Sequence, residues 1–498
     1  MIKYLHSLCC FMLIFVSAKS QTIAVGDNGD FPNLEALDGL VSAGDTVQLE
    51  AQVFSDGTQF LVDWIGTEVS PIVILGASDH QSIFRGGTEA IHLIDCNYVV
   101  IDGIRVEQQT GNGINIDDGG DYSTPSTHIT IRDCLFRDMA GAGNNDLLKM
   151  SGVDSFFIQG CQFVNGGPGG SGVDFVGCHW GVVEDCFFED PGVTGIQCKG
   201  GTQFIRMQRN TFKNVSQRAL NLGGSTGLEF FRPPLPDPIV DAFEAADLEV
   251  FSNVFIGSRA PVAYVGSVRV KVYNNTFYNP DNWVIRILQE NTATGFLVCG
   301  DNEFRNNIVY LPGDLTEVNI GPNTASETFG FSNNLWFNAS SDSWTPNLPV
   351  PDIDQIIDDP LFEDPVNENF IIPSNSPAVG AGLTVETPVT DFNNWPFLSP
   401  PSIGAFEGGE PSSQADLESK NIHVQLFPNP AMHSIWVDGE RNQSRLVFLN
   451  TLGQVLKRID NISLPVRVDV SDFPAGVISV LLVDLSSKRA HARRFIKR

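Results

Sequence analysis

The hexapeptide VYNNTF (residues 272–277) decides the fold of this chain, because variants of it recur through the middle of the sequence. Each copy has an apolar residue, two mostly polar residues, then Cys or Asn in all but the first copy, one further residue and another apolar one. The copies are IDGIRV (101–106), IRDCLF (131–136), IQGCQF (158–163), VEDCFF (183–188), MQRNTF (207–212), VFSNVF (250–255), VYNNTF (272–277), FRNNIV (304–309) and FSNNLW (331–336). Most successive copies are 22 to 32 residues apart, and one pair is 43 apart. A self-similar period of this length is typical of a solenoid.

A second short apolar–polar alternation follows the hexapeptide in most repeats and predicts another half-buried strand. Its copies are GINI (113–116), LLKM (147–150), GVDF (172–175), GIQC (195–198), ALNL (219–222), VAYV (262–265) and VIRI (284–287). Gly, Asn, Asp and Pro separate the strands, as in turns. Short strands without a helical pattern between them favour an all-β parallel β-helix over a leucine-rich repeat.

The fourth position of the hexapeptide is a column that changes from Cys to Asn along the chain. Stacked Asn side chains at Asn210, Asn253, Asn275, Asn307 and Asn334 predict a ladder of amide hydrogen bonds. Cys134, Cys161 and Cys186 predict a buried stack of thiols. The alternative is a disulfide in this column, which parallel Cβ directions suit poorly.

Composition sets limits on the function. The 498 residues include 59 Asp and Glu against 30 Lys and Arg, a formal charge of −29, which argues against nucleic acid as a partner. A hydrophobic content of 42% excludes general disorder. A single globular core does not reach this length, but a repeat protein does, because each repeat packs only on its neighbours.

The N-terminus predicts a signal peptide over residues 1–20, cleaved before Gln21. Lys3 precedes an apolar run at 8–16, and Ala18 and Ser20 are the small residues before the cut. The alternative, a membrane anchor, needs a longer apolar run than this one. We therefore expect an exported protein without a transmembrane segment. Cys9 and Cys10 leave with the signal, so seven of nine cysteines remain, an odd number that forbids complete pairing.

The repeats resemble the right-handed parallel β-helix of the pectin-lyase superfamily over about residues 21–410. The tail DPLFEDPVNENFIIPSNSPAVGAG (359–382), with DFNN (391–394) and IGAFE (403–407), is similar to the terminal coil segment of many secreted bacterial members. The resemblance implies a domain at 21–410 of the single-stranded, right-handed type. It names no substrate, because this fold serves lyases, hydrolases, epimerases and binding proteins alike.

The C-terminal region differs from the rest. Residues 411–420 form a polar linker, and residues 421–498 hold 11 Lys and Arg against 6 Asp and Glu, with alternating strands that predict a small β-sandwich. FPNP (427–430), LGQVL (452–456) and FPAGVISVLL (473–482) resemble the type A sorting domain of the type IX secretion system of Bacteroidetes. That resemblance implies the secretion machinery as a partner and export through periplasm and outer membrane to the surface or the medium. The alternative is a binding sandwich, such as a sugar-binding module.

Candidate functional residues lie on the outward face of the second strand, where alternation places a polar strip. The strip contains Asn115, Asp117, Lys149, Asp174, Gln197, Lys199 and Asn221. Residues 21–420 hold only 17 Lys and Arg, yet ten fall between 199 and 286, which suits an acidic polysaccharide. These ten are Lys199, Arg206, Arg209, Lys213, Arg218, Arg232, Arg259, Arg269, Lys271 and Arg286. The alternative is that at least half of them lie on solvated strand faces.

Two insertions, 223–244 and 289–303, interrupt the coils beside this strip, and loops on a rigid scaffold often carry function. Phe230, Phe231 and Arg232 in the first could stack on sugar rings and pair with a carboxylate, and Arg286 could add a further contact. Alternatively, the two phenylalanines fasten the insertion to the helix.

The segment 195–224 is similar to the region of β-helical polysaccharide lyases that carries a catalytic Lys and, one coil later, an Arg. The resemblance implies Lys199 as the general base of a β-elimination on a uronate, next to the Gly200–Gly201 pair that would let a sugar approach the backbone. The family's Arg would fall near Gly223, so Arg218, in the preceding turn, or Arg232 would have to supply the positive charge, with Asn221 as a hydrogen-bond partner of the sugar. Calcium serves several such lyases, and Asp117, Asp118 and Asp121 form the densest acidic group near the strip. The alternative is a solvated acidic turn.

Three functions follow from these observations. The first is a polysaccharide lyase-like enzyme acting on a uronate-containing polymer. The second is a non-catalytic glycan-binding or adhesin-like surface protein. The third is a glycoside hydrolase on the same fold, which needs a pair of carboxylates where only Asp174 faces outward in the centre of the strip.

Overall fold

The structure is a computed structural model that describes most of the chain. Described are residues 20–408 except 342, 386 and 389, and then 425–427, 434–438, 444–449, 455–462, 466–474, 476–484 and 490–497. The predicted signal peptide, apart from Ser20, and the predicted linker at 411–420 lie outside these residues. No helix among the described residues is long and apolar enough to cross a membrane.

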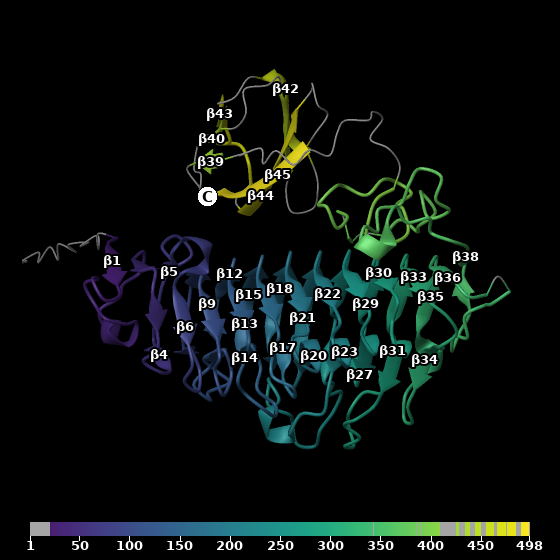
Figure 1. Cartoon of the computed structure of the whole chain (residues 1–498), viewed down its shortest axis with the longest axis horizontal. Coiled ribbons are helices and arrows are strands. Elements are labelled where there is room, and N and C mark those ends of the chain that lie inside the picture. The colour runs from purple at the N-terminus through teal and green to yellow at the C-terminus, as the bar shows by residue number, and fades with distance from the viewer. Residues whose placement is uncertain are drawn as a thin grey trace, which may run out of the picture.

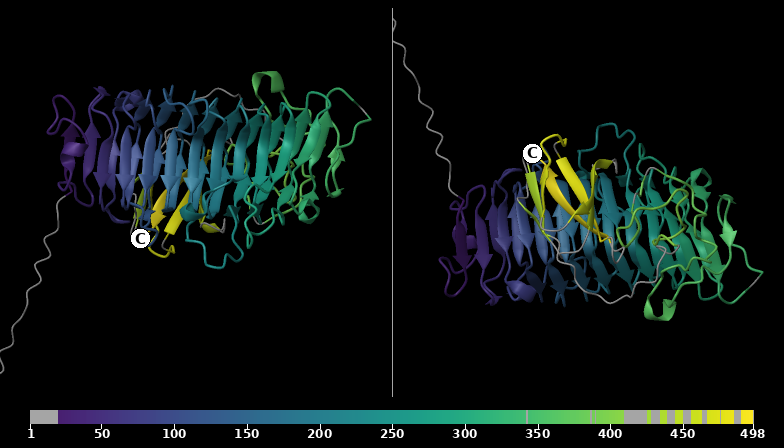
Figure 2. Two further views of the ribbon diagram at one scale, coloured as in Figure 1. Left: turned by 90° about the horizontal axis from the view of Figure 1, so that it is seen from below. Right: turned by 90° about the horizontal axis from the view of Figure 1, so that it is seen from above.

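Residues 22–357 form a parallel β-helix, in which most coils contribute a strand to each of three sheets (Figure 1). Figure 2 shows the strands of successive coils side by side along the long axis of the molecule. The strands of one sheet pair in register with the coils before and after, so that equivalent residues form columns.

The strands of the helix have the following bounds. Sheet A contains β1 (Thr22–Val25), β2 (Thr46–Leu49), β5 (Ile72–Leu75), β8 (Val99–Asp102), β11 (Ser126–Thr127), β12 (Thr130–Arg132), β15 (Val153–Gln159), β18 (His179–Glu184), β21 (Thr202–Gln208), β24 (Ala245–Ala246), β25 (Glu249–Phe251), β28 (Ser267–Val268), β29 (Lys271–Tyr273), β32 (Glu303–Arg305), β35 (Gly330–Ser332) and β37 (Asp352–Ile353). Sheet B contains β3 (Val53–Phe54), β6 (Ile83–Arg85), β9 (Arg105–Glu107), β13 (Leu135–Arg137), β16 (Gln162–Val164), β19 (Phe187–Glu189), β22 (Thr211–Lys213), β26 (Val254–Ile256), β30 (Thr276–Tyr278), β33 (Ile308–Leu311), β36 (Leu335–Asn338) and β38 (Ile356–Ile357). Sheet C contains β4 (Gln59–Val62), β7 (Ile91–Ile94), β10 (Ile114–Asp117), β14 (Leu148–Ser151), β17 (Ser171–Val176), β20 (Thr194–Lys199), β23 (Arg218–Gly223), β27 (Ala260–Val265), β31 (Trp283–Leu288) and β34 (Thr316–Ile320).

Helical structure in the described residues is limited to short 3₁₀ turns. They are η1 (Glu35–Leu37), η2 (Ser78–His80), η3 (Leu228–Phe230), η4 (Ser326–Thr328) and η5 (Pro365–Asn367). The prediction of an all-β solenoid is therefore confirmed.

The hexapeptide is two strands rather than one, which corrects the expectation from sequence. In IRDCLF the chain leaves sheet A at Arg132 and enters sheet B at Leu135. Asp133 turns the chain with a φ of 50°, in the left-handed region that Asp and Asn tolerate better than most residues. The bend accounts for the polar third position of the repeat.

Phenylalanines at the last hexapeptide position build the centre of the core. The rings of Phe136, Phe163, Phe188, Phe212, Phe255 and Phe277 stack from coil to coil with centroids 4.6 to 5.0 Å apart. All six are fully buried. Burial of such large apolar side chains is the main favourable contribution to folding.

The predicted Asn ladder is present. Asn210 donates through Nδ2 to Oδ1 of Asn253, and the same bond joins Asn253 to Asn275, Asn275 to Asn307 and Asn307 to Asn334, at 3.0 to 3.1 Å. Each of these amides also donates to a main-chain carbonyl, at 2.9 to 3.0 Å.

The cysteines of the preceding coils are free thiols, as predicted, and the disulfide alternative is wrong. All seven of the described cysteines are unpaired and buried. Burial raises the pKa of Cys134 and Cys161 well above the usual range, so these thiols stay protonated. They pack as small apolar groups rather than as nucleophiles.

The tail at 359–407 is not a terminal coil but a strap across the outer face of sheet B (Figure 1). Phe362, Phe370 and Ile403 pack against Ile308 and Leu335, which point outward from sheet B. The strap forms because sheet B carries apolar residues on its outer face here, and covering them removes that surface from water.

The C-terminal region forms two antiparallel sheets with a shared core. β39 (Gln425–Phe427), β40 (Ser434–Asp438) and β43 (Val466–Asp469) make one sheet, and β41 (Ser444–Leu449), β42 (Val455–Ile462), β44 (Gly476–Asp484) and β45 (Ala490–Lys497) make the other. Ile435 and Val468 of the first sheet pack with Leu446, Phe448 and Val480 of the second. The predicted small β-sandwich is confirmed.

Candidate functional site

The predicted polar strip lies on the outer face of sheet C. The strand register places Asn115 beside Lys149, Lys149 beside Asp174, Asp174 beside Gln197, and Gln197 beside Asn221. The column continues through His92 at one end and through Ala263, Arg286 and Asn319 at the other. Alternation alone thus predicted which side chains leave the core.

Asp174 is the centre of an ion-pair cluster on this face. Its Oδ2 binds Nζ of Lys149 from the preceding coil and lies 3.0 Å from Nζ of Lys199 on the following coil. Asp146, just before β14, lies 3.8 Å from Lys149. The two carboxylates are only 1% exposed, whereas Lys149 and Lys199 are 20% and 15% exposed. The lysines therefore cover the acids.

Burial and the neighbouring charges shift the pKa values of the groups in this cluster. Burial, and then the charge of Asp174, raise the pKa of Asp146 well above its ordinary range. Burial lowers the pKa of Lys149, but the negative charges of Asp174 and Asp146 raise it by more, so the pKa lies above its ordinary value. Oδ1 of Asp174 and Oδ2 of Asp146 have no hydrogen-bond partner among the described residues. Asp146 could not be predicted from the sequence pattern, because it precedes the alternating segment.

The glycines after Lys199 do not leave an open approach for a sugar, contrary to the expectation. Gly200 donates its N–H to Oε2 of Glu244 and accepts a bond from the N–H of Arg232, at 3.1 and 3.0 Å. A Cβ on Gly201 would lie 2.4 Å from the carbonyl oxygen of Arg232. The insertion 223–244 therefore covers this glycine pair.

Arg232 and Phe231 fasten that insertion and are not available as substrate ligands. Arg232 donates to both carboxylate oxygens of Asp154, at 2.6 and 2.7 Å, and is 8% exposed. Burial raises the pKa of Asp154, but Arg232 and His179 outweigh it and bring the pKa to about 2. Phe231 is 1% exposed and meets Phe296 of the second insertion edge to face, with centroids 5.4 Å apart. Only Phe230 remains on the surface.

Basic residues gather farther along sheet C, around Trp283. The guanidinium carbons of Arg286 and Arg259 lie 4.5 and 5.3 Å from the centroid of its ring. Arg218 is close enough for its charge to act on Arg286. Burial, and then the charge of Arg218, lower the pKa of Arg286. The structure thus brings together two predicted residues, Arg218 and Arg286, with two that carried no assigned role, Arg259 and Trp283.

Arg218 lies on a strand rather than on a turn, which corrects the sequence interpretation. It is the first residue of β23 and pairs with Thr194 and Ala260 of the neighbouring coils. Its guanidinium donates to Oδ1 of Asn221 at 2.8 Å and lies 3.4 Å from Glu290. Asn221 is only 4% exposed and also donates to Gly223.

The other basic residues of the predicted band lie elsewhere and are paired. Arg206 and Arg269 on the sheet A side bind Glu249 and Asp247, Arg209 binds Glu184 and Asp185, and Lys213 on sheet B binds Glu189 and Glu368. With Lys271, which lies 3.9 Å from Glu249, five of the ten basic residues thus form ion pairs away from sheet C, although Arg209 is buried rather than on a solvated face.

The three aspartates of the predicted calcium site do not converge. Asp117 binds Nε2 of His92 at 2.7 Å, Asp118 accepts the N–H of Gly120, and Asp121 accepts two bonds from Ser123. Among the described residues, no group of three or more His, Cys, Asp or Glu is placed to hold a metal ion.

Comparison with known proteins supports the type of helix. Residues 72–231 match the family model described as right handed beta helix region. No protein of curated function matches the chain. The handedness implied by the sequence resemblance thus agrees with the matched family.

Several solved structures are similar at low identity. An alginate lyase from Paenibacillus sp. str. FPU-7 is 13% identical, with a TM-score of 0.41, over 64% of this chain and 97% of that one. The pectate lyase Pel9A is 13% identical, with a TM-score of 0.43, over 79% and 98%. PorZ, a type IX secretion component of Porphyromonas gingivalis, is 21% identical, with a TM-score of 0.14, over 15% and 11%. At these scores the similarities assign no residue a role.

Proposed function

We propose that this protein binds a uronate-containing polysaccharide along the outer face of sheet C. The observation that carries the proposal is the pair Arg259 and Arg286 over the ring of Trp283, with Arg218 close enough for its charge to act on Arg286. The residues before position 421 are strongly acidic, so a gathering of cations on one face is exceptional there. A guanidinium binds a carboxylate through two parallel hydrogen bonds, and an aromatic ring packs on the apolar face of a sugar.

The charges of this group favour an anionic ligand over a neutral one. Arg259 and Arg286 form no ion pair with any described residue, and Arg218 forms one such pair, with Glu290 at 3.4 Å. The lowered pKa of Arg286 reports repulsion between neighbouring cations as well as burial. A bound carboxylate would relieve that repulsion, which is the electrostatic basis for selectivity.

A finer proposal places β-elimination at the Lys199 end of the same face. Lys199 would take the C5 proton of a uronate, and Arg218 would hold the charge that develops on the carboxylate. The C4–C5 double bond would then form as the C4–O glycosidic bond breaks, and the leaving oxygen would take a proton from water. Proton transfer requires that the ammonium of Lys199 leave Asp174 and lose its proton first. The substrate carboxylate would compete with Asp174 for the two lysines and so open this pair.

Binding is tested by affinity electrophoresis in gels containing polygalacturonate, alginate or hyaluronan. We expect retardation of the wild type in at least one gel. Binding by Arg259→Gln/Arg286→Gln should be at least about tenfold weaker, since a single charge-assisted bond already contributes about 1.5–3 kcal/mol. Arg132→Gln is the matched control, because Arg132 is an exposed sheet A residue paired with Asp102. Equal binding by the double variant would reject the arginine site.

Catalysis is tested on the same polymers by the ultraviolet absorbance of unsaturated product, with and without calcium. For a general base at Lys199, Lys199→Ala should lower turnover about 10²–10⁴-fold while retaining binding. Binding of a polyuronate without any product would favour the non-catalytic glycan-binding function. A glycoside hydrolase is disfavoured, since Asp146 and Asp174 are both covered by lysines.

We further propose that residues 421–498 direct export through the type IX secretion system to the cell surface or the medium. The proposal rests on the three sequence motifs and on the sandwich of β39–β45. Deletion of 421–498 should leave the protein in the periplasm of its native host, as measured by fractionation and immunoblotting. Release of the truncated protein at the normal level would contradict the proposal.

A further inference from the structure

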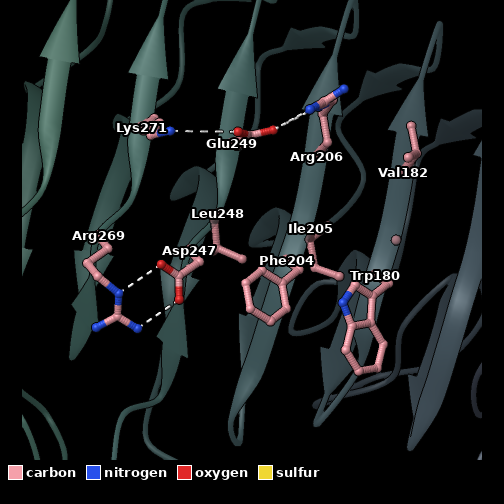
Figure 3. A pocket seen from close by; sticks show the side chains of 11 residues that line it. Trp180, Val182, Phe204, Ile205, Arg206, Asp247, Leu248, Glu249, Arg269 and Lys271 are labelled. Carbon is pink, nitrogen blue, oxygen red and sulfur yellow. Dashed lines mark hydrogen bonds and ion pairs between the residues drawn. The ribbon is translucent and has the colours of Figure 1, made fainter. Parts of the chain in front are cut away.

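A groove of about 490 Å³ lies on the outer face of sheet A, a different sheet from the one that carries the arginine group (Figure 3). It runs across β18, β21, β25 and β29. No part of the polysaccharide site proposed above uses it. Its lining combines two exposed aromatic rings with a row of charged residues.

The two rings form a flat platform. Trp180 and Phe204 come from adjacent coils, are 58% and 45% exposed, and lie parallel within 11°, with centroids 5.9 Å apart. Figure 3 shows them side by side with their broad faces turned in the same direction. Large exposed apolar surfaces of this kind are uncommon in soluble proteins and mark binding sites.

The backbone at both positions argues that the rings have a function. Trp180 and Phe204 have φ angles of 57° and 60°, a left-handed conformation that Gly, Asn and Asp adopt at lower cost than bulky residues. The same bend occurs at Asp247 in the next coil, with a φ of 52°. The bend therefore does not require an aromatic residue, and the rings gain little burial that would offset the strain.

The charged residues of the groove are paired with one another, three cations against two carboxylates. Arg206 binds Glu249 at 2.6 and 2.8 Å, and Arg269 binds Asp247 at 2.7 and 2.8 Å. Lys271 lies 3.9 Å from Glu249. Figure 3 shows these pairs beside the platform. Paired side chains keep free lone pairs and N–H groups that can bond to hydroxyls. Each cation of the groove already lies beside a carboxylate, whereas Arg259 and Arg286 on sheet C form no ion pair with any described residue.

We infer that this groove is a second carbohydrate site, which binds an uncharged pyranose polysaccharide. Two neighbouring sugar rings would stack on Trp180 and Phe204, and their hydroxyls would bond to Asp247, Glu249 and Arg206. The two sheets would then bind chemically different polymers, an anionic one on sheet C and a neutral one on sheet A. The inference does not depend on the sheet C proposal.

The test uses the full-length protein with Trp180→Asn/Phe204→Asn. Asn removes both aromatic faces but is well tolerated at a positive φ, so the variant should unfold at a temperature equal to or above that of the wild type. Trp395→Ala is the matched control, because Trp395 is 39% exposed and lies outside the groove. Affinity electrophoresis with xyloglucan, galactomannan and laminarin supplies neutral probes, and alginate supplies an anionic one.

We expect the wild type to bind at least one neutral polymer, and the Asn double variant to bind that polymer at least about tenfold more weakly. Trp395→Ala and Arg259→Gln/Arg286→Gln should bind the neutral polymer as the wild type does. Binding of polyuronate should be unaffected by the Asn substitutions. Failure of the wild type to bind any neutral probe, or equal binding by the Asn variant, would overturn the inference. A wild-type dimer in light scattering that the Asn substitutions dissociate would also overturn it, by assigning the rings to contact with a second copy.

Discussion

Asp174 holds two ammonium groups from the coils on either side of it, Lys149 and Lys199. Burying a carboxylate between two lysines costs little folding free energy only while both ion pairs persist, because each charged group has lost most of its contact with water. Removing the carboxylate leaves two like charges in a partly dry environment. The stability of this part of sheet C therefore depends on one side chain.

Asp174→Asn should lower the free energy of unfolding by about 2–4 kcal/mol, the range expected when one partner of a largely buried ion pair is lost and its neighbours keep some water. Guanidinium chloride unfolding measures the change. Asp102→Asn is the control, because its partner Arg132 is exposed, and such surface pairs contribute up to about 1 kcal/mol. Equal effects of the two substitutions would show that Asp174 does not hold the lysines together.

His92 gives the molecule a pH-dependent contribution to stability. Its ring N–H groups donate to Asp117 and to Glu89, and these hydrogen bonds raise its pKa from 6.5 to about 9. Asn115 and the ring of Phe60 are its other neighbours. A pKa raised in the folded state adds stability below the unfolded pKa of 6.5, and that stability is lost as the pH rises through about 9.

His92→Gln should therefore be less stable than the wild type by about 1–2 kcal/mol at pH 6, allowing for partial solvation, and the difference should shrink by pH 9.5. Urea unfolding at a series of pH values measures it. A difference that stays constant across this range would show that the histidine is not charged in the native state.

The alternation of the repeats was sufficient to predict that Lys149, Asp174 and Lys199 leave the core. It could not predict that Arg232 would bind Asp154, 78 residues earlier in the chain. Such contacts depend on how an insertion folds back, and an insertion has no repeat from which its position can be read. The site residues in the repeating strands could therefore be predicted from the sequence, and the contacts made by the insertions could not.

Among the structural elements, the Asn ladder links five coils through one side chain each. Asn275 accepts from the main chain and Nδ2 of Asn253, and donates to Asn307 and to the carbonyl of Val250. The sequence predicted this element because the same residue recurs at the same position. The division of each hexapeptide between sheets A and B was missed because a polar residue in a short strand looks the same as one in a bend.

Asn275→Leu should destabilise the protein by about 1–3 kcal/mol, the cost of leaving buried polar partners unsatisfied. Thermal or denaturant unfolding measures the loss. If the variant is as stable as its parent, the amide bonds of the ladder contribute nothing net to stability.

For the whole molecule, the hydrophobic core of the β-helix and that of the C-terminal sandwich are separate clusters. A fragment of residues 20–408 should therefore fold alone, with an almost purely β circular dichroism spectrum and the same melting temperature as the corresponding transition of the full chain. Calorimetry of both proteins measures this. A fragment that melts well below the full chain would show that the sandwich supports the helix.

The strap at 359–407 has a consequence for how the helix comes apart. Coils in a stack normally fray one at a time from an exposed end, since each is held only by its neighbours. The strap bonds to Ser252, Asn274, Thr276, Asn306 and Asn333, which belong to four successive coils, and Glu368 reaches Lys213 in the coil before them. These coils can therefore open only together, after the strap has been released. Amide exchange in β25–β36 should be concerted and slow, and opening should begin from the N-terminal coils instead.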